Sequence, residues 1–374
     1  MDLPPLTYLT FDEVGRGVGA SQVVPYVERL AATGLEITLH SYEQTSPTDA
    51  LRRRLRSAGV DWRTHAFRAG GARSALRRIA GAARFVRGAE LVHARSDLPA
   101  AAAMLGRADA WLWDVRSFWI DQRIALGLAR PNGSLERAMR RVEAAAAHRS
   151  TAITTLTGAA IDVLAERHGA EVRAKAVVVP TCTDLRRFTA TPMPSGELTL
   201  MLSGTFNELY DRAKTFALVD AVSRRTTVRL FSARPRPGTW DADVEARGGA
   251  LVSAPYEDMP ELVAKAHAGL CICRIGHRLA IVAAAPTKIA EHLAAGRPVV
   301  VNRGLGDMDD HIAASGCGVV VDTDVEAAAD QLIALLADPA TPGRCRRVAE
   351  DVFSLDVGIE RLLGCYRRAV HVAP

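Results

Sequence analysis

The sequence predicts an α/β protein with two Rossmann-like parallel-sheet domains that face each other across a cleft. Three observations predict this architecture. Short apolar segments alternate with helical segments along nearly the whole chain. The chain has 374 residues, more than one compact core usually holds. A Pro/Gly/Ser-rich stretch at 189–197 interrupts the alternation near its middle, as expected of a linker.

The first domain is predicted to span residues 1–188. Its strands are expected at Leu6–Phe11, Leu35–Tyr42, Glu90–Ala94, Ala110–Val115, Thr151–Leu156 and Ala176–Val179. Ser21 is expected to cap the first helix, which Gly34 ends. Because helical segments separate the strands, we expect parallel pairing with right-handed crossovers.

The second domain is predicted to span residues 189–353. Its strands are expected at Leu198–Ser203, Thr227–Ser232, Gly269–Cys273, Pro298–Asn302 and Gly318–Val321. The tail, 354–372, has the pattern of one more helix, a candidate to pack back on the first domain. Since ligands of open α/β sheets bind beyond the carboxyl ends of the strands, those ends are where we expect functional residues.

The composition excludes several protein classes. With 48% hydrophobic and 24% charged residues, the chain is neither disordered nor collagenous. No apolar run approaches the roughly 18–20 residues that a membrane span needs. Met1–Pro5 lacks the pattern of a secretory signal, and the six cysteines form no CxxC pair. We therefore expect a cytoplasmic protein with reduced, mostly buried thiols and no metal site.

Positive charge is concentrated in one segment. The formal net charge is +5, and residues 51–95 contain twelve arginines against two acids. Such a cluster suits anionic lipid, nucleic acid or a phosphorylated substrate, and a solvated basic face is the simpler alternative. Because aromatic residues are sparse there, we expect no nucleic-acid partner. Peripheral association with the inner face of a membrane, through 51–95, stays open.

A glycine-rich turn follows the first predicted strand. Gly15, Gly17 and Gly19 lead into the first helix, where exposed backbone N–H groups favour a phosphate or another anion. Gly15–Ala20 also fits Gly-x-Gly-x-x-Ala, the dinucleotide fingerprint, with Glu43 as the acid after the second strand. An NAD(P)-dependent oxidoreductase is therefore an alternative, although the turn begins late after the strand.

The most informative segment is 285–301. Pro286 suits the first position of a short helix and Gly296 its carboxyl end. The N–H groups of Thr287 and Lys288, together with the lysine ammonium, offer positive charge to a diphosphate. Glu291 lies on the same side of the helix and suits the two hydroxyls of a ribose. The alternative is an exposed helix with a Lys–Glu pair.

This segment resembles the donor-binding helix of GT-B glycosyltransferases, particularly those of the retaining family 4, with their Pro-x-Lys-x-x-Glu-Tyr-Leu-Ala-x-Gly-x-Pro-Val pattern. His292 replaces the tyrosine. Further segments resemble the family in the same order, namely Val23–Leu39, Glu90–Ser96, Trp113–Asp121, Val179–Phe188 and Tyr256–Leu262.

The resemblance implies a retaining, metal-independent transfer of a sugar from a nucleoside-diphosphate donor, which is a co-substrate and not a cofactor. The acceptor would be a small molecule, a glycan or a lipid-linked hydroxyl. The implied residues are Gly204, Thr205, Thr287, Lys288 and Glu291 for the donor, Asp114 and Arg116 for catalysis, His93 and Trp119 for the acceptor, and Gly15, Gly17 and Gly19 as a phosphate or acceptor loop. A structural Asp–Arg pair is the alternative for Asp114.

The chain also departs from the family pattern. Counting eight residues back from Glu291 gives Ala283, where many members have a first glutamate. The usual Gly-Arg…Lys phosphate grip is replaced by Ser203–Asn207, with Lys214 further on. A GT-B protein without normal sugar-transfer activity is therefore a second alternative.

Overall fold

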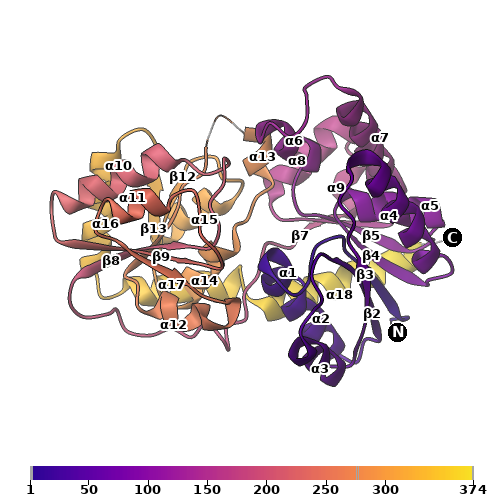
Figure 1. The fold of residues 1–374 in the computed structure, drawn as a ribbon, viewed down its shortest axis with the longest axis horizontal. Helices are drawn as coiled ribbons and strands as arrows, with labels where there is room; N and C mark the ends of the chain where they lie inside the picture. Colours follow the sequence, from indigo (N-terminus) through magenta and orange to yellow (C-terminus); the bar gives the residue numbers. More distant parts are fainter. Residues whose placement is uncertain (1–2, 275, 277, 373–374) are drawn as a thin grey trace. The chain divides into compact units, whose positions relative to one another are not determined.

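The computed structural model describes residues 3–274, 276 and 278–372 and divides into two compact units. The first unit holds the described residues up to Pro180 together with those from Leu355 onward, and the second holds Thr181–Ser354. Each unit is an α/β structure with one parallel sheet (Figure 1). The predicted fold class is confirmed.

The first unit contains a seven-stranded sheet in the order β3-β2-β1-β4-β5-β6-β7. Its strands are β1 (Leu6–Leu9), β2 (Ile37–Glu43), β3 (Val60–Ala66), β4 (Leu91–Arg95), β5 (Trp111–Val115), β6 (Ala152–Thr155) and β7 (Ala176–Val178). All neighbouring strands pair in parallel. The order reverses beside β1, so β1 and β4 form the topological switch point where ligands of such sheets bind.

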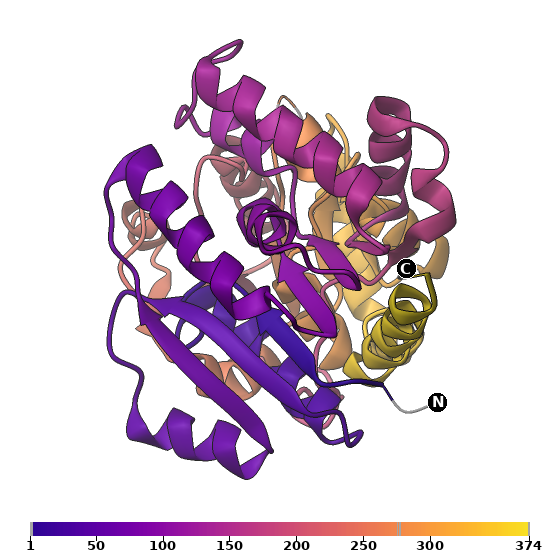
Figure 2. The same cartoon turned by 90° about the vertical axis from the view of Figure 1, so that its right-hand side faces the viewer.

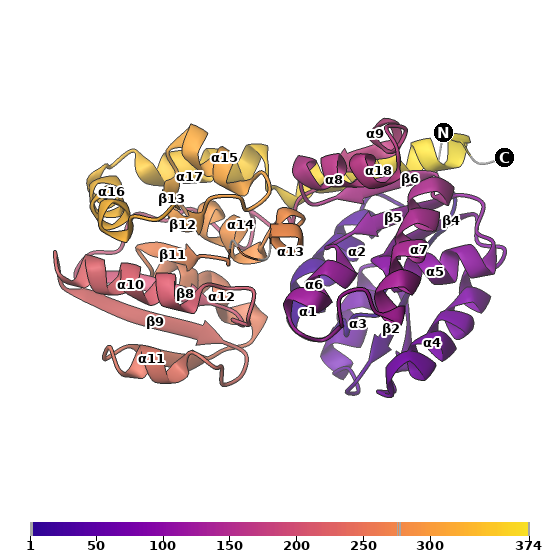
Figure 3. The ribbon, with the colours of Figure 1, turned by 90° about the horizontal axis from the view of Figure 1, so that it is seen from above.

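Helices cover both faces of this sheet. They are α1 (Gly17–Gln22), α2 (Val24–Ala31), α3 (Asp49–Ser57), α4 (Gly71–Val86), α5 (Asp97–Gly106), α6 (Trp119–Ala125), α7 (Ser134–Arg149), α8 (Gly158–His168), α9 (Val172–Lys175) and α18 (Leu355–Val372). The helix α18, drawn in yellow, packs against α2 and the strands β5 and β6 (Figure 2). The helices α4 and α5 lie side by side (Figure 3).

The second unit contains a six-stranded parallel sheet in the order β10-β9-β8-β11-β12-β13. Its strands are β8 (Leu198–Ser203), β9 (Val228–Arg234), β10 (Ala250–Ser253), β11 (Ala268–Cys271), β12 (Val299–Asn302) and β13 (Gly318–Val321). Its helices are α10 (Arg212–Ser223), α11 (Asp241–Glu245), η1 (Tyr256–Asp258), α12 (Met259–Ala264), α13 (Arg278–Val282), α14 (Thr287–Ala294), α15 (Met308–Ser315), α16 (Val325–Ala337) and α17 (Thr341–Asp351). The pairs α10–α16 and α14–α17 each pack closely.

The predicted strands are present with small shifts at their ends, but two edge strands were not predicted. Polar residues interrupt β3, and the apolar run of β10, Ala250–Val252, is only three residues long, so neither forms the longer apolar run by which the inner strands are recognised. The expected cap at Ser21 is also wrong. The helix α1 begins at Gly17, and Ser21 lies inside it with its hydroxyl donating to the Gly17 carbonyl at 3.3 Å.

The linker is anchored to the second unit. Residues 189–197 contain no helix or strand, and residues 181–188 group with the second unit. The fully buried guanidinium of Arg297 donates to the carbonyl and hydroxyl oxygens of Thr191 and to the carbonyls of Pro192 and Ala264, at 2.5–2.9 Å. This arginine therefore ties the linker to the segment that carries α14.

The sequence also predicts buried cysteines and contains no apolar run long enough for a membrane span. All six cysteines are buried and none forms a disulfide, as expected of reduced thiols. Over the described residues, the helices are too short or too polar to cross a bilayer.

Candidate functional site

The start of α14 carries the predicted donor-binding residues. Pro286 lies one position before the first helical residue, and Gly296, with φ of 78°, ends the helix in a left-handed conformation. The side chains of Lys288 and Glu291 point into the second unit, since the two residues are only 8% and 4% exposed. This burial excludes the alternative of an exposed Lys–Glu pair. It places two ionisable side chains of one helical turn in the protein interior.

The ammonium of Lys288 lies between two aromatic rings. Its Nζ is 3.7 Å from the ring centroid of Phe206 and 4.4 Å from that of Tyr210. No described residue hydrogen-bonds to this buried nitrogen. Burial lowers the pKa of Lys288, whereas Cys271, Cys273 and Glu291 raise it. Because a buried ammonium without an acceptor is costly, its three N–H donors suit an anion such as a phosphate.

Glu291 lies one turn further along α14, beside Tyr256 and Arg187. Burial raises the pKa of Glu291 to about 7, although the hydrogen bond from Tyr256 and the charges of Lys288 and Arg187 lower it. The guanidinium of Arg187 lies 4.7 Å from the Tyr256 ring and donates to the Tyr256 carbonyl at 3.3 Å. A carboxylate has about four acceptor sites, so the bond from Tyr256 leaves others for a diol.

Gly204 ends β8 next to Lys288. Its φ of 78° suits glycine, and a Cβ added there would lie 4.0 Å from Cε of Lys288. The exposed Thr205 follows and, with Gly204, lines a cavity of about 20 Å³, room for roughly one water molecule. Thr287 is half-buried at the start of α14. The structure thus brings Gly204 and Lys288 together and places Thr205 at their edge.

Sequence reasoning missed two arginines beside this cavity. Arg234 ends β9 and Arg236 follows it, and both line the cavity together with Trp240. Arg234 forms a two-pronged ion pair with Asp241, whereas Arg236 is exposed. The signal in the sequence is the Arg-Pro-Arg tripeptide directly after a predicted strand, at the end where ligands bind. Positive charge is therefore present near Gly204 although the usual arginine is absent.

His292, which replaces the tyrosine of the family pattern, has a packing role. Its ring lies so close to Gly269 of β11 that a Cβ there would be 2.6 Å from the ring. Its Nε2 lies 3.4 Å from the hydroxyl of Ser203. Burial lowers the pKa of His292 to about 3, so the imidazole is neutral at physiological pH. This neutral ring fixes α14 against β8 and β11.

In the first unit, Asp114 stands at the carboxyl end of β5 and is surrounded by donors. Its carboxylate oxygens lie 3.0 Å from the Thr154 hydroxyl, 3.2 Å from Nε2 of His93, 3.4 Å from Arg95 and 3.6 Å from Arg116. Burial raises the pKa of this carboxyl, but Arg116, His93 and Arg95 bring it well below its usual range. Such a carboxylate is a weak base, so its contacts favour a positioning role.

The same cluster extends to both ends of the chain. Nδ1 of His93 lies 2.7 Å from the Tyr366 hydroxyl of α18. Arg95 and Arg116 each donate to Oε1 of Gln22 at 2.9 Å. Gln22, His93, Arg95, Asp114 and Arg116 line a cavity of about 10 Å³, room for roughly one water molecule. Arg95 was not predicted, although its place directly after the His93 strand indicates the same sheet edge.

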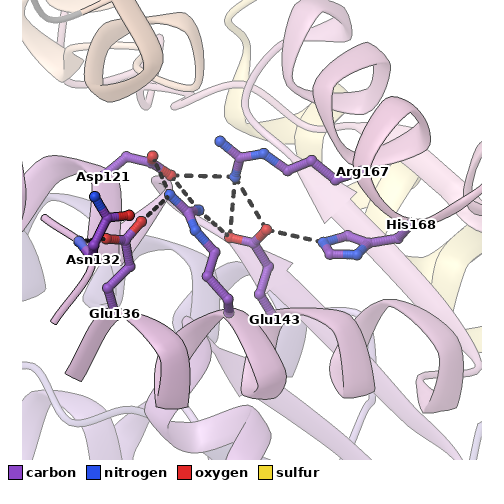
Figure 4. Close-up of polar contacts among 7 residues, drawn as sticks. Asp121, Asn132, Glu136, Glu143, Arg167 and His168 are labelled. Carbon is purple, nitrogen blue, oxygen red and sulfur yellow. Dashed lines mark hydrogen bonds and ion pairs between the residues drawn. The ribbon is translucent and has the colours of Figure 1, made fainter. Parts of the chain in front are cut away.

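Trp119 begins α6, away from the Asp114 contacts. It is half-buried, and the Arg123 guanidinium lies 4.8 Å from its ring. Asp121, two residues later, accepts from Arg140 at 2.6 and 2.8 Å and from Arg167 at 3.2 Å. Figure 4 shows how these groups meet Glu143 and His168 between α6, α7 and α8. The buried charges compensate one another and hold α6 in place, so they are structural.

The glycine-rich turn has packing reasons for two of its glycines. Gly17 has φ of 54°, and a Cβ on Gly19 would lie 2.0 Å from the Glu13 carbonyl oxygen. The buried Glu43 accepts from the Val14 amide at 3.1 Å and the Ser41 hydroxyl at 2.5 Å. Both bonds end on Oε1 of Glu43, which thereby holds the turn to the end of β2.

The comparisons with known proteins place this fold. No protein-family model and no curated protein matches the sequence. Among solved structures, the chain is similar to sucrose-phosphate synthase from Thermosynechococcus elongatus, with a TM-score of 0.71, 15% identity and 98% of each chain covered. It is also similar to HepE from Anabaena in complex with UDP and glucose (TM-score 0.67, 13% identity, 97% of this chain and 99% of that chain).

A third similar structure is a putative UDP-N-acetylglucosamine 2-epimerase from Listeria monocytogenes. Its TM-score is 0.63 at 12% identity, and 97% of this chain and 95% of that chain are covered. Likeness at these identities shows the fold, and the fold is GT-B.

Proposed function

We propose that this protein is a glycosyltransferase that moves a sugar from a nucleoside-diphosphate donor to an acceptor hydroxyl. The second unit binds the donor, a co-substrate and not a resident cofactor. The first unit binds the acceptor, a small molecule, a glycan or a lipid-linked hydroxyl. The residues proposed for the donor are Gly204, Thr205, Thr287, Lys288 and Glu291.

The observation that carries this proposal is the buried ammonium of Lys288, which receives no hydrogen-bond acceptor from the described residues and lies one turn before the buried carboxyl of Glu291. A diphosphate supplies the anion that Lys288 lacks, and the ribose hydroxyls donate to Glu291. A spacing of three residues in a helix places both groups on one side. HepE, which shares the fold, was solved with UDP.

The chemistry follows from the charge at this helix start. When the sugar leaves the donor, negative charge develops on the diphosphate, and Lys288 with the N–H groups of the first turn stabilises it. Because the sequence around α14 resembles the retaining family 4, we propose that transfer proceeds with retention and without a metal ion. In that reaction the acceptor attacks from the face that the diphosphate leaves.

In the first unit, we propose that Asp114 and Arg116 act as a pair. Asp114 holds Arg116 and His93 at the sheet edge, which fits its strongly lowered pKa. Arg116 then contacts the acceptor, with Trp119 at the start of α6, while the buried His93 holds Asp114 through Nε2 and Tyr366 through Nδ1. The turn with Gly15, Gly17 and Gly19 presents backbone N–H groups to a phosphate or to acceptor oxygens.

We propose that the protein works in the cytoplasm and associates peripherally with anionic lipid through segment 51–95. The support is the outer face of α4, where Arg73, Arg77 and Arg84 are exposed beside a 65% exposed Leu76. Flotation with vesicles containing phosphatidylserine tests this proposal. Equal recovery with neutral and anionic vesicles would contradict it.

A second candidate is an enzyme that acts on a nucleotide sugar without transferring it. Two observations favour it: Ala283, fully buried, stands where many family 4 members have a glutamate, and a putative epimerase shares the fold. Both candidates bind the same nucleotide, so binding alone does not separate them.

Calorimetric titration with UDP, GDP, dTDP and NAD tests the proposal and its alternatives together. We expect one nucleoside diphosphate to bind and NAD not to bind. Binding of NAD alone would instead establish the oxidoreductase alternative. For the nucleotide that binds, incubation with its sugar donors followed by mass spectrometry separates the candidates, because an isomerised donor with no acceptor requirement would indicate the second.

A further inference from the structure

The loop between β8 and α10 forms an aromatic environment around Lys288. Family 4 members have an arginine in this loop, whereas this chain has Phe206 and then Tyr210. The two rings meet edge to face, with centroids 4.8 Å apart and planes at 63°. The Lys288 ammonium lies over both rings. The loop thus surrounds the cation on two sides with electron-rich faces.

The positions of both rings are fixed by their neighbours. Phe206 stacks on Trp240, with centroids 4.4 Å apart and planes at 25°. The backbone of Tyr210 pairs with that of Cys273 in an isolated bridge, and the Asp211 amide donates to the Ile272 carbonyl at 2.9 Å. The loop is therefore held to the segment after β11, and the rings have little freedom to leave Lys288.

The two aromatic rings leave the Lys288 ammonium available to an incoming anion, which a salt bridge would not. Aromatic faces attract a cation but do not neutralise it, and they occupy none of its N–H donors with an oxygen acceptor. The groups that titrate or carry charge around Lys288 are Cys271 and Cys273 at the end of β11, Tyr210 in the loop, and Glu291 and His292 in α14. None of them hydrogen-bonds to Nζ.

We propose that Phe206 and Tyr210 are positioning residues that keep Lys288 charged and aimed at the donor diphosphate. They stabilise the protonated amine in a buried place and leave its donors for phosphate oxygens. This inference rests on the proposed function of the same site.

The direct test is a pH titration of the Lys288 amine. NMR of protein labelled with ¹³C at lysine Cε monitors this titration. The chain has only four lysines, 175, 214, 265 and 288, so Lys288→Arg assigns the signal. We expect the pKa of Lys288 to fall by about one unit or more in Phe206→Leu and Tyr210→Leu, because each loses a ring that favours the charged amine. Phe206→Tyr and Tyr210→Phe keep a ring and should retain the wild-type value.

The functional readout is the affinity for UDP between pH 7 and 9. The leucine variants should lose about tenfold in affinity at pH 8, and their affinity should decline at a lower pH than that of the wild type. Folding is verified by the far-ultraviolet circular dichroism spectrum and by the melting temperature. A folded leucine variant with the wild-type Lys288 titration overturns the inference. If the wild type binds no nucleoside diphosphate, the proposed function fails, whereas the lysine titration still tests the effect of the rings.

Discussion

Replacing Glu291 with glutamine should stabilise the protein and weaken donor binding at the same time. The pKa of this carboxyl lies at about 7 in the folded chain, against an ordinary 4.5. The unfolded chain therefore releases the proton at lower pH, and the free energy of unfolding falls as pH rises from about 4.5 to about 7. A difference of about 2.5 units corresponds to a cost of up to about 3 kcal/mol at pH 8. Glu291→Gln removes this cost.

The same substitution removes a charged acceptor from the ribose hydroxyls. We expect the affinity for the nucleotide sugar that the wild type binds to weaken at pH 8 by about 1–3 kcal/mol, or roughly 5- to 150-fold in Kd. A nucleotide sugar, for example UDP-glucose, is preferred to the free nucleoside diphosphate because it lacks the terminal phosphate that titrates near pH 6. In the wild type, affinity should rise as pH passes through about 7, and this rise should be absent in the variant.

Urea unfolding and calorimetry at pH 5 and pH 8 measure both effects. The control is Glu261→Gln, which changes an exposed glutamate of α12 in the same unit. The control should leave stability and affinity unchanged. The reasoning is refuted if Glu291→Gln is less stable than the wild type at pH 8, or if it binds the nucleotide sugar as tightly with the same pH dependence.

Three further outcomes are expected. Gly204→Ala should lower the free energy of unfolding by about 1–2 kcal/mol because residue 204 has a positive φ, and it should weaken UDP binding beside Lys288. A wild-type melting temperature in the variant would contradict the expected loss of stability. Asp114→Asn should lower the free energy of unfolding in urea by about 3–5 kcal/mol, because it leaves the buried donors of His93 and Arg95 without their carboxylate. A decrease below about 1 kcal/mol would contradict a charged Asp114 in the folded protein. Burial lowers the pKa of His40 to about 4, so the free energy of unfolding should fall as pH drops from about 6.5 to 4. In denaturant titrations, His40→Gln should reduce this fall by about 2 kcal/mol. An unchanged fall in the variant would exclude His40 as its source.

The inner strands and the α14 helix were predictable because their signals are local. A buried parallel strand is a continuous apolar run, and the boundaries of α14 follow from Pro286 and Gly296. The strand β3 escaped prediction because polar residues interrupt it, and β10 because its apolar run, Ala250–Val252, is only three residues long. Sequence patterns therefore identify a longer apolar run or a capped helix more readily than a short or interrupted strand.

The site was only partly predictable for a different reason. The sequence places Lys288 and Glu291 on one side of a helix, but it does not show that both are buried or that Phe206 faces the ammonium. Those facts depend on how the loop after β8 is held against the segment after β11. Likewise, the acid predicted to be catalytic, Asp114, proved to be held by donors from separate strands, which no spacing in the sequence reveals.

The most direct measurement is the affinity of Lys288→Met for UDP, GDP and dTDP, compared with that of the wild type. The control variant is Lys265→Met, which changes an exposed lysine of the same unit. We predict that the wild type and Lys265→Met bind one of these nucleotides equally well and that Lys288→Met loses at least about tenfold, the effect of removing one charge-assisted phosphate contact. Equal affinity in all three proteins, or no binding by the wild type, would contradict a diphosphate site at the start of α14.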